Sequence, residues 1–207
     1  MNISPYLLSL AVLGCLPASA ELVTSIQSVT SSPGNTNSSF EFDVTNTGMS
    51  SVTVAAFSFH LTVPSAIIFQ SASISTLVNP YIFDVADSFD NLISTPLSSS
   101  VTSTDIIGAD AWVGMSSGFV LGAGSTVGLG EVYFNVDPAA ALGPYTVAFT
   151  NVNTDTSFSD PGGNYIPITT ASSGTISVVA PEPATVSMMA IALAGLTLAA
   201  RKRRKLS

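Results

Sequence analysis

The five basic residues of this 207-residue chain all lie in one run near its C-terminus, Arg201, Lys202, Arg203, Arg204 and Lys205. Residues 1–200 therefore contain no lysine or arginine. Directly before the run, residues 184–200 are apolar and uncharged. A helix of that length spans about 25 Å, close to the ~30 Å hydrocarbon core of a bilayer. Because cationic residues stay on the cytoplasmic side, the run predicts a single crossing that leaves the rest of the chain outside.

The N-terminal segment has the pattern of a cleavable signal peptide. An apolar core over residues 7–16 is followed by Ala18 and Ala20, which form a small-x-small cleavage site. The N-terminal amine supplies the only positive charge of this leader. The alternative is a lipoprotein-type leader in which Cys15 is lipidated. Cleavage after Ala20 removes the only cysteine, so the mature chain would form no disulfide bond.

Residues 21–180 have the length of one domain and carry one-sided charge. Of the 13 Asp and Glu residues in the chain, all but Glu182 lie in this segment. Nucleic acid is excluded as a partner because phosphate contacts require cations. Anionic membrane surfaces and acidic polysaccharides would also be repelled. The remaining partners are neutral polysaccharides, divalent cations and basic proteins.

The apolar pattern of residues 21–180 is that of β-strands. Phe40, Phe42 and Val44 alternate with polar residues, as in a half-buried strand. Out-of-phase steps at residues 55–56 and between Leu129 and Val132 predict β-bulges. Further strands are expected at residues 22–29, 52–54, 57–63, 66–74, 111–115, 127–136, 145–149 and 176–178. Turn residues separate these runs, so the sequence predicts an all-β antiparallel sandwich.

Three segments of residues 21–180 do not fit the strand pattern. Residues 139–142 could form one helical turn, and residues 81–92 could hold a short irregular helix. Residues 94–105 are rich in Ser and Thr, which predicts an exposed loop.

The mature segment lacks the side chains of most enzyme mechanisms. His60 is the only histidine, and alternation places it opposite Phe57 and Phe59, at an exposed or rim position. The absence of cysteine, lysine and arginine excludes thiolate nucleophiles, Schiff bases and phosphate-binding loops. A non-catalytic protein is therefore expected. The remote alternative is a glycan hydrolase, which needs only two suitably spaced carboxylates.

Two groups of residues are candidate ligand sites. Asp84, Asp87 and Asp90 supply hard oxygen ligands of the kind calcium prefers, with Asp105 and Asp110 expected nearby. Their spacing is not that of an EF-hand loop, and surface turns commonly carry such aspartates. Tyr81 and Phe83 form a candidate platform for stacking on sugar rings, whereas Trp112 is expected in the core.

The C-terminal residues resemble a known sorting signal. The succession of Pro181, Glu182 and Pro183, the apolar stretch 184–200 and the basic run 201–205 is similar to the PEP-CTERM signal of Gram-negative surface proteins. This resemblance implies recognition by a membrane-embedded exosortase, cleavage near the motif and delivery to the cell surface or extracellular matrix. The expected organisation is a signal peptide at 1–20, a sandwich at 21–180 and a sorting signal at 181–207. The alternative is a permanent C-terminal membrane anchor.

The body of the chain resembles cohesin-like and carbohydrate-binding-module sandwiches. The resemblance rests on residues 57–69, where Pro64 closes a strand, and on residues 129–149, where Gly143 and Pro144 separate two strands. It implies a cohesin-like or jelly-roll arrangement of the predicted strands. The function expected from both resemblances is an exported, non-catalytic surface or matrix protein associated with exopolysaccharide. The alternative is a carbohydrate- or protein-binding module of cohesin type.

Overall fold

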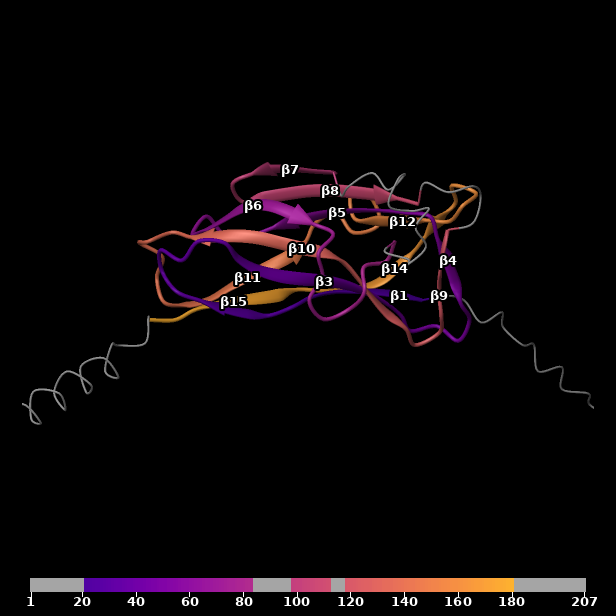
Figure 1. The fold of residues 1–207 in the computed structure, drawn as a ribbon, viewed down its shortest axis with the longest axis horizontal. Helices are drawn as coiled ribbons and strands as arrows, with labels where there is room; N and C mark the ends of the chain where they lie inside the picture. The colour runs from indigo at the N-terminus through magenta and orange to yellow at the C-terminus, as the bar shows by residue number, and fades with distance from the viewer. Residues whose placement is uncertain (1–20, 84–97, 113–117, 181–207) are drawn as a thin grey trace, which may run out of the picture.

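A computed structural model describes residues 21–83, 98–112 and 118–180, and strands are the only regular elements in these ranges (Figure 1). The strands are β1 (Leu22–Ile26), β2 (Val29–Ser31), β3 (Ser38–Asn46), β4 (Val52–Val54), β5 (Ala56–Thr62), β6 (Ile67–Ser73), β7 (Ser98–Thr102), β8 (Asp105–Ala111), β9 (Phe119–Leu121), β10 (Thr126–Val136), β11 (Gly143–Phe149), β12 (Ser157–Ser159), β13 (Tyr165–Ile166), β14 (Ile168–Ser172) and β15 (Gly174–Val178).

The strands form two main sheets that pack face to face. One sheet has the order β14-β1-β3-β10-β6. The other has the order β13-β12-β5-β11-β15-β2, and β8 and β7 extend it from β5. A separate small sheet joins β4 to β9. Most pairs are antiparallel, so the predicted all-β antiparallel sandwich is confirmed.

The beginning and the end of the body cross between the two sheets together. β1 pairs in parallel with β14 in the first sheet, and β2 pairs in parallel with β15 in the second. Gly174 lies at this crossing, where a Cβ atom would come within 2.6 Å of Ile26 Cγ2. The close approach of the two segments therefore requires a glycine. This double crossing ties the two layers together along one side of the sandwich.

Aromatic side chains from both sheets fill the core between them. The ring centroids of Phe42 on β3 and Phe59 on β5 lie 4.6 Å apart across the interface. Phe40 packs against Phe69 and Phe134 within its own sheet. Phe40, Phe42 and Phe59 occupy the inward positions that alternation predicted, because successive side chains of a strand point to opposite faces. Burial of their apolar surface is the main favourable contribution to the fold.

Several sequence predictions differ from the structure at strand boundaries. Around residues 55–56 the chain passes from β4 in the two-stranded sheet to β5 in the eight-stranded sheet. The bulge predicted there is therefore wrong. The second bulge is confirmed, since the register of β10 with β3 shifts between Gly128 and Gly130. β7 lies inside the expected 94–105 loop, and β8 ends at Ala111, where a strand was expected to begin.

Neither expected short helix occurs in the described residues. Residues 139–142 contain a turn, in which the Ala140 N–H donates to the Asp137 carbonyl at 2.9 Å. Residues 81–83 are not helical, and the rest of the 81–92 segment lies largely outside the described ranges.

Residues 21 and 180 lie at opposite ends of the sandwich (Figure 1). Glu21 is held by its carbonyl, which accepts a hydrogen bond from the Thr47 N–H at 2.8 Å. The last strand ends where the Val179 N–H donates to the Ser31 carbonyl, at 2.9 Å. Within the described residues no helix is long and apolar enough to cross a membrane. The expected signal peptide at 1–20 and membrane span at 184–200 lie outside those residues.

Candidate functional site

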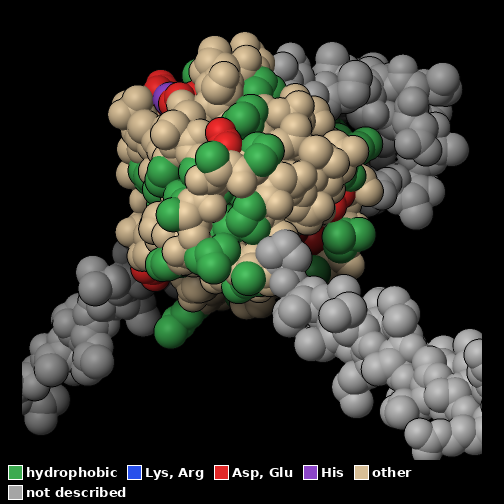
Figure 2. All heavy atoms as spheres, turned by 90° about the vertical axis from the view of Figure 1, so that its left-hand side faces the viewer, with side chains coloured by type: hydrophobic (Ala, Val, Ile, Leu, Met, Phe, Trp, Pro, Cys, Tyr) green, Lys and Arg blue, Asp and Glu red, His purple; other side chains and the backbone are tan. Residues whose placement is uncertain are grey.

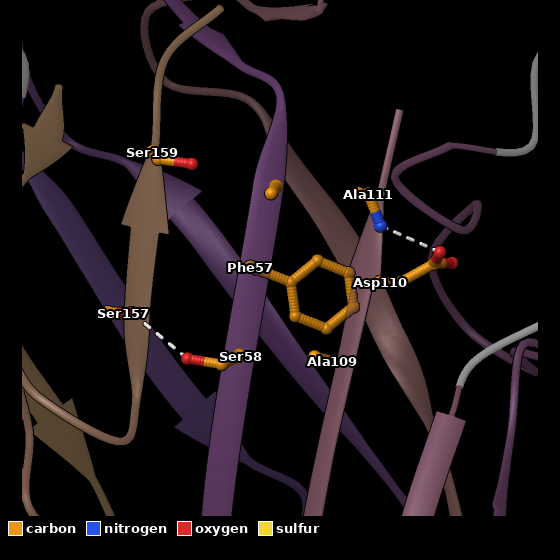
Figure 3. Close-up of a pocket in the computed structure, with 8 residues that line it drawn as sticks. Phe57, Ser58, Ala109, Asp110, Ala111, Ser157 and Ser159 are labelled. Atoms are coloured by element: carbon orange, nitrogen blue, oxygen red, sulfur yellow. Dashed lines mark hydrogen bonds between the residues drawn. The ribbon is translucent and has the colours of Figure 1, made fainter. Parts of the chain in front are cut away.

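Small side chains create a hollow on the outer face of the larger sheet, across β12, β5 and β8. Strand register places Ser58 beside Ser157 on one side and beside Ala109 on the other. The next outward row consists of Ser159, Ala56 and Ala111 in the same order. Because none of these side chains is larger than serine, the sheet surface is depressed there. The resulting hollow has a volume of about 400 Å³ (Figure 3).

The floor of the hollow is formed by Phe57 and Asp110, which are neighbours in the strand register and are both buried. The Tyr81 hydroxyl donates to Asp110 Oδ2, and the Ala111 N–H donates to Oδ1 at 2.7 Å. Burial raises the pKa of Asp110 above its usual range, although both hydrogen bonds oppose the shift. Burial, followed by the bond to Asp110, also raises the pKa of Tyr81. Among the described residues that line the hollow, Asp110 is the only carboxylate, whereas a glycoside hydrolase requires two.

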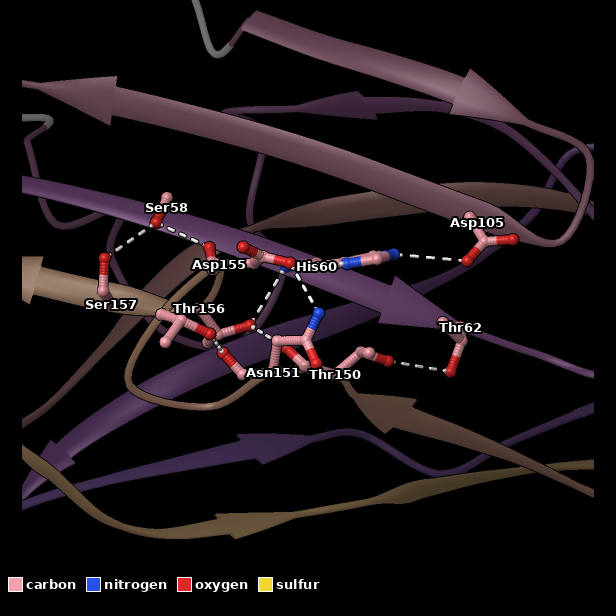
Figure 4. Close-up of polar contacts among 10 residues, drawn as sticks. Ser58, His60, Thr62, Asp105, Thr150, Asn151, Asp155, Thr156 and Ser157 are labelled. Atoms are coloured by element: carbon pink, nitrogen blue, oxygen red, sulfur yellow. Dashed lines mark hydrogen bonds and ion pairs between the residues drawn. The ribbon is translucent and has the colours of Figure 1, made fainter.

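His60 lies next to the hollow on β5 and is flanked by two carboxylates (Figure 4). Its Nε2 atom is 3.2 Å from Asp105 Oδ1, and its Nδ1 atom is 3.4 Å from Asp155 Oδ2. Asn151 Nδ2 also donates to Asp155 Oδ2, at 2.7 Å. Hydrogen bonds from Asn151 and then His60 lower the pKa of Asp155. His60 points away from the core, as alternation predicted, and both ring nitrogens already have partners.

A second polar cluster lies on the outer side of the five-stranded sheet that contains β3. The Glu41 side chain is buried, and its Oε2 atom accepts the N–H groups of Leu77 and Val78, each at 2.8 Å. The Asn79 N–H donates to Glu41 Oε1 at 2.9 Å. The loop at residues 74–80 is therefore fastened over β3 by backbone donors that bind one carboxylate.

Asp43 lies on the same outer face of β3 as Glu41. Asn79 Nδ2 donates to Asp43 Oδ1 at 3.1 Å. Burial is the largest influence and raises the pKa of Asp43 to about 6, the Asn79 bond lowers it, and the neighbouring Glu41 raises it. On β10, Glu131 stands opposite Glu41 and accepts the Tyr133 hydroxyl at 2.7 Å. These carboxylates are stabilised by neutral hydrogen-bond donors rather than by cations.

The predicted sugar platform at Tyr81 and Phe83 is wrong. The two residues are only 5% and 4% exposed, because they close one end of the core. The Phe83 ring packs against Phe57 at 5.8 Å and against Trp112 at 6.0 Å between centroids. Neither ring can present its face to a sugar in solution. Trp112 is half-buried against this cluster, in keeping with its expected core position.

Only part of the predicted calcium site lies within the described residues. Asp84, Asp87 and Asp90 lie outside the described residues. Asp105 and Asp110 point to opposite faces of β8, since the first contacts His60 and the second contacts Tyr81. They cannot share one ion, so the expectation that both lie near one site is wrong. No group of three or more acidic, His or Cys side chains in the described ranges is arranged to hold a metal.

The hollow and the Glu41 cluster were both missed by sequence reasoning. A signal for the hollow is present in the alternate small residues Ala56 and Ser58 of one strand and Ala109 and Ala111 of another. It becomes meaningful only when the register between those strands is known. Nothing near Glu41 in the sequence shows that a loop more than thirty residues away binds its carboxylate.

Comparison with known proteins gives separate results for the tail and the body. Residues 179–204 match the family described as the PEP-CTERM protein-sorting motif. The chain carries this sorting motif. It implies that the protein is exported and sorted by an exosortase through a membrane-anchored intermediate. The individual residues predicted to act in the tail, Pro181 to Pro183 and Arg201 to Lys205, lie outside the described structure, as do Ala18 and Ala20.

The body is similar in fold to cohesin domains. The third ScaC cohesin of Acetivibrio cellulolyticus, solved in complex with the ScaB dockerin, is 18% identical and has a TM-score of 0.57, covering 77% of this chain and 99% of that one. The seventh ScaB type I cohesin of Pseudobacteroides cellulosolvens is 15% identical, with a TM-score of 0.54 and coverage of 79% and 95%. A non-cellulosomal cohesin of Archaeoglobus fulgidus is 14% identical, with a TM-score of 0.53 and coverage of 81% and 98%. A search of curated proteins gave no match.

The raised pKa of Asp43 predicts how the stability of the protein depends on pH. Its pKa is about 6 in the folded protein against 3.8 ordinarily, so the folded state binds more protons between these values. The stabilisation that protonated Asp43 contributes is complete below pH 3.8 and is lost as the pH rises through about 6. Asp43→Asn removes this titration, so the free energy of unfolding should decline less than in the wild type between pH 4 and 6.

Urea unfolding at several pH values provides the measurement. Asp160→Asn is the matched control, because hydrogen bonds from Asn164 lower the pKa of Asp160. Its stabilising contribution is present at neutral pH and is lost as pH falls below the ordinary value, in the opposite direction. If the free energy of unfolding of Asp43→Asn declined with pH as steeply as that of the wild type, the role assigned to Asp43 in this decline would be contradicted.

Proposed function

We propose that this protein is an exported, non-catalytic surface protein that an exosortase processes near residues 181–183. The match of residues 179–204 to a protein-sorting motif carries the proposal. The apolar stretch 184–200 followed directly by the only basic residues supports one crossing with the body outside. In this account the signal peptide at 1–20 starts export, and the tail holds the protein in the inner membrane until cleavage.

We further propose that the exported sandwich is a binding module and that the hollow between β12 and β8 receives its partner. The hollow adjoins His60, its two flanking carboxylates and the exposed side chain of Ile107. This combination of shape, apolar surface and negative charge suits a segment of a protein that carries basic residues. Support by analogy comes from the cohesin relatives solved as complexes with dockerins.

A neutral polysaccharide is the second candidate partner. The hydroxyl groups of Ser58, Ser157 and Ser159 line the hollow and could bind sugar hydroxyls. However, Phe57 is the only aromatic residue among the described residues of the lining, and it is buried, so these residues offer no stacking surface. For this reason a protein partner fits the described face better than the matrix polysaccharide expected from the sequence.

Processing of the tail is testable by mass spectrometry of the protein recovered from the culture medium and from membranes. The exported form should end near residues 181–185, and cells that lack the exosortase should accumulate the chain with Arg201 to Ser207 intact in the membrane fraction. An intact tail on the surface form in normal cells would instead indicate a permanent anchor. Full-length chain in the cytosol with its leader uncut would contradict export itself.

Filling the hollow should abolish partner binding. Ala109→Trp projects a large ring into it from an exposed position, while Thr170→Trp places the same ring on exposed β14 in the other sheet. Surface changes of this kind alter stability by about 0.5 kcal/mol or less. The share of processed protein released from cells into the medium should rise at least several-fold for the first variant and stay unchanged for the second.

The class of partner follows from rebinding of the wild-type protein to treated cells. Loss of binding after protease treatment supports a protein partner. Loss only after removal of surface polysaccharide supports the second candidate. Equal retention of both tryptophan variants would contradict the assignment of the hollow as the binding site.

A further inference from the structure

An apolar surface covers the end of the sandwich from which the C-terminal tail emerges. Figure 2 shows hydrophobic side chains gathered across this end. We call it the apolar end and define it by the exposed residues Pro138, Ala139, Ala141, Leu142, Val179 and Ala180. Leu142 is 60% exposed and Val179 is 44% exposed. Leu142 and Val179 each lie one residue beyond the strand pair of Gly143 and Val178, so their backbones are close together.

Hydrogen bonds hold the apolar end in shape. The Asp137 N–H donates to the Ala66 carbonyl at 2.9 Å, and the Ala139 N–H donates to Asp137 Oδ1 at 2.7 Å. The Tyr145 hydroxyl donates to the Ala141 carbonyl at 2.9 Å. The apolar side chains are therefore presented by an ordered turn, and little conformational entropy would be lost when they contact another surface.

The tail leaves the body from within this same surface. The bond from the Val179 N–H to the Ser31 carbonyl fixes the chain there, and only residues 180–183 separate Val179 from the expected membrane span. Fully extended residues span at most about 3.6 Å each, so the apolar end is tethered within roughly 18 Å of the bilayer. Residue 21 lies at the opposite end of the sandwich.

Charge at the apolar end is low for such an acidic protein. Residues 31–40, 62–70, 101–105, 136–146 and 176–180 contain two carboxylates, Asp105 and Asp137, and Asp105 contacts His60. Carboxylates are repelled by anionic lipid headgroups over a distance of about 8 Å at physiological salt. The rest of the body would meet this repulsion at a membrane surface, whereas the apolar end largely avoids it.

We propose that the apolar end rests in the interfacial region of the bilayer while residues 184–200 anchor the chain. The inference rests on the proposed membrane-anchored intermediate and adds a defined orientation to it. Apolar side chains bind at the boundary of headgroups and acyl chains because they leave water there. The contact holds the motif at 181–183 at the membrane surface, within reach of a membrane-embedded peptidase. Cleavage removes the anchor, and the body then detaches.

Site-specific fluorescence tests the contact. The protein is purified from membranes of cells that lack the exosortase, in a Cys15→Ser background, so that one introduced cysteine is the only thiol. Leu142→Cys labels the apolar end, and Met49→Cys is the matched control, since Met49 is 89% exposed in the turn after β3, near Glu21. Each carries an environment-sensitive dye and is reconstituted in vesicles of phosphatidylethanolamine and phosphatidylglycerol.

The expected result is a shift of dye emission to shorter wavelength at position 142, with quenching by nitroxide-labelled lipids, and neither effect at position 49. Addition of Leu142→Asp to an Ala139→Cys reporter should reverse the shift seen with that reporter alone. If the protein floats with the vesicles but both labels remain water-like, the contact is refuted and the anchor stands. If the protein does not float with the vesicles, the proposed anchor fails and the inference fails with it. An equal response at both positions also overturns the inference.

Discussion

The described structure depends on a constraint of charge: an acidic body without lysine or arginine must stabilise its carboxylates with neutral donors. Glu41 is the extreme case, because a buried carboxylate is costly unless hydrogen bonds replace its water. Three consecutive backbone N–H groups fill that role. Asp110 uses a tyrosine hydroxyl and a backbone N–H, and Asp160 uses Asn164.

These bonds also determine which surfaces are ordered. The Glu41 carboxylate fastens the 74–80 loop over the five-stranded sheet. The hydrogen bond between Tyr81 and Asp110 closes the core beneath the hollow. His60 and Asn151 hold the turn that carries Asp155 beside β5. The candidate binding face is thus bordered by hydrogen-bond donors and by acidic groups. No lysine or arginine of the body offsets its negative charge, which favours basic partners.

The sequence predicted the fold class because alternation in β3, β5, β10 and β11 is local and strong. It could not show that residues 55–56 change sheets, since a bulge and a change of sheet produce the same shift of phase. Tyr81 and Phe83 resembled loop aromatics, yet packing with Phe57 and Trp112 buries them. The hollow depends on the register of three strands that are distant in sequence, information that alternation does not contain. The sorting motif was recognisable because its order along the chain is itself the signal.

Amide hydrogen exchange at Leu77, Val78 and Asn79 tests most directly whether neutral donors stabilise the buried carboxylates. The account predicts that these loop amides are protected in the wild type, because each donates to Glu41. In Glu41→Ala their protection should be lost, while the amides of β3 and β10 that pair within the sheet remain slow. Rapid exchange of the three amides in the wild-type protein, as in an unattached surface loop, would contradict the account.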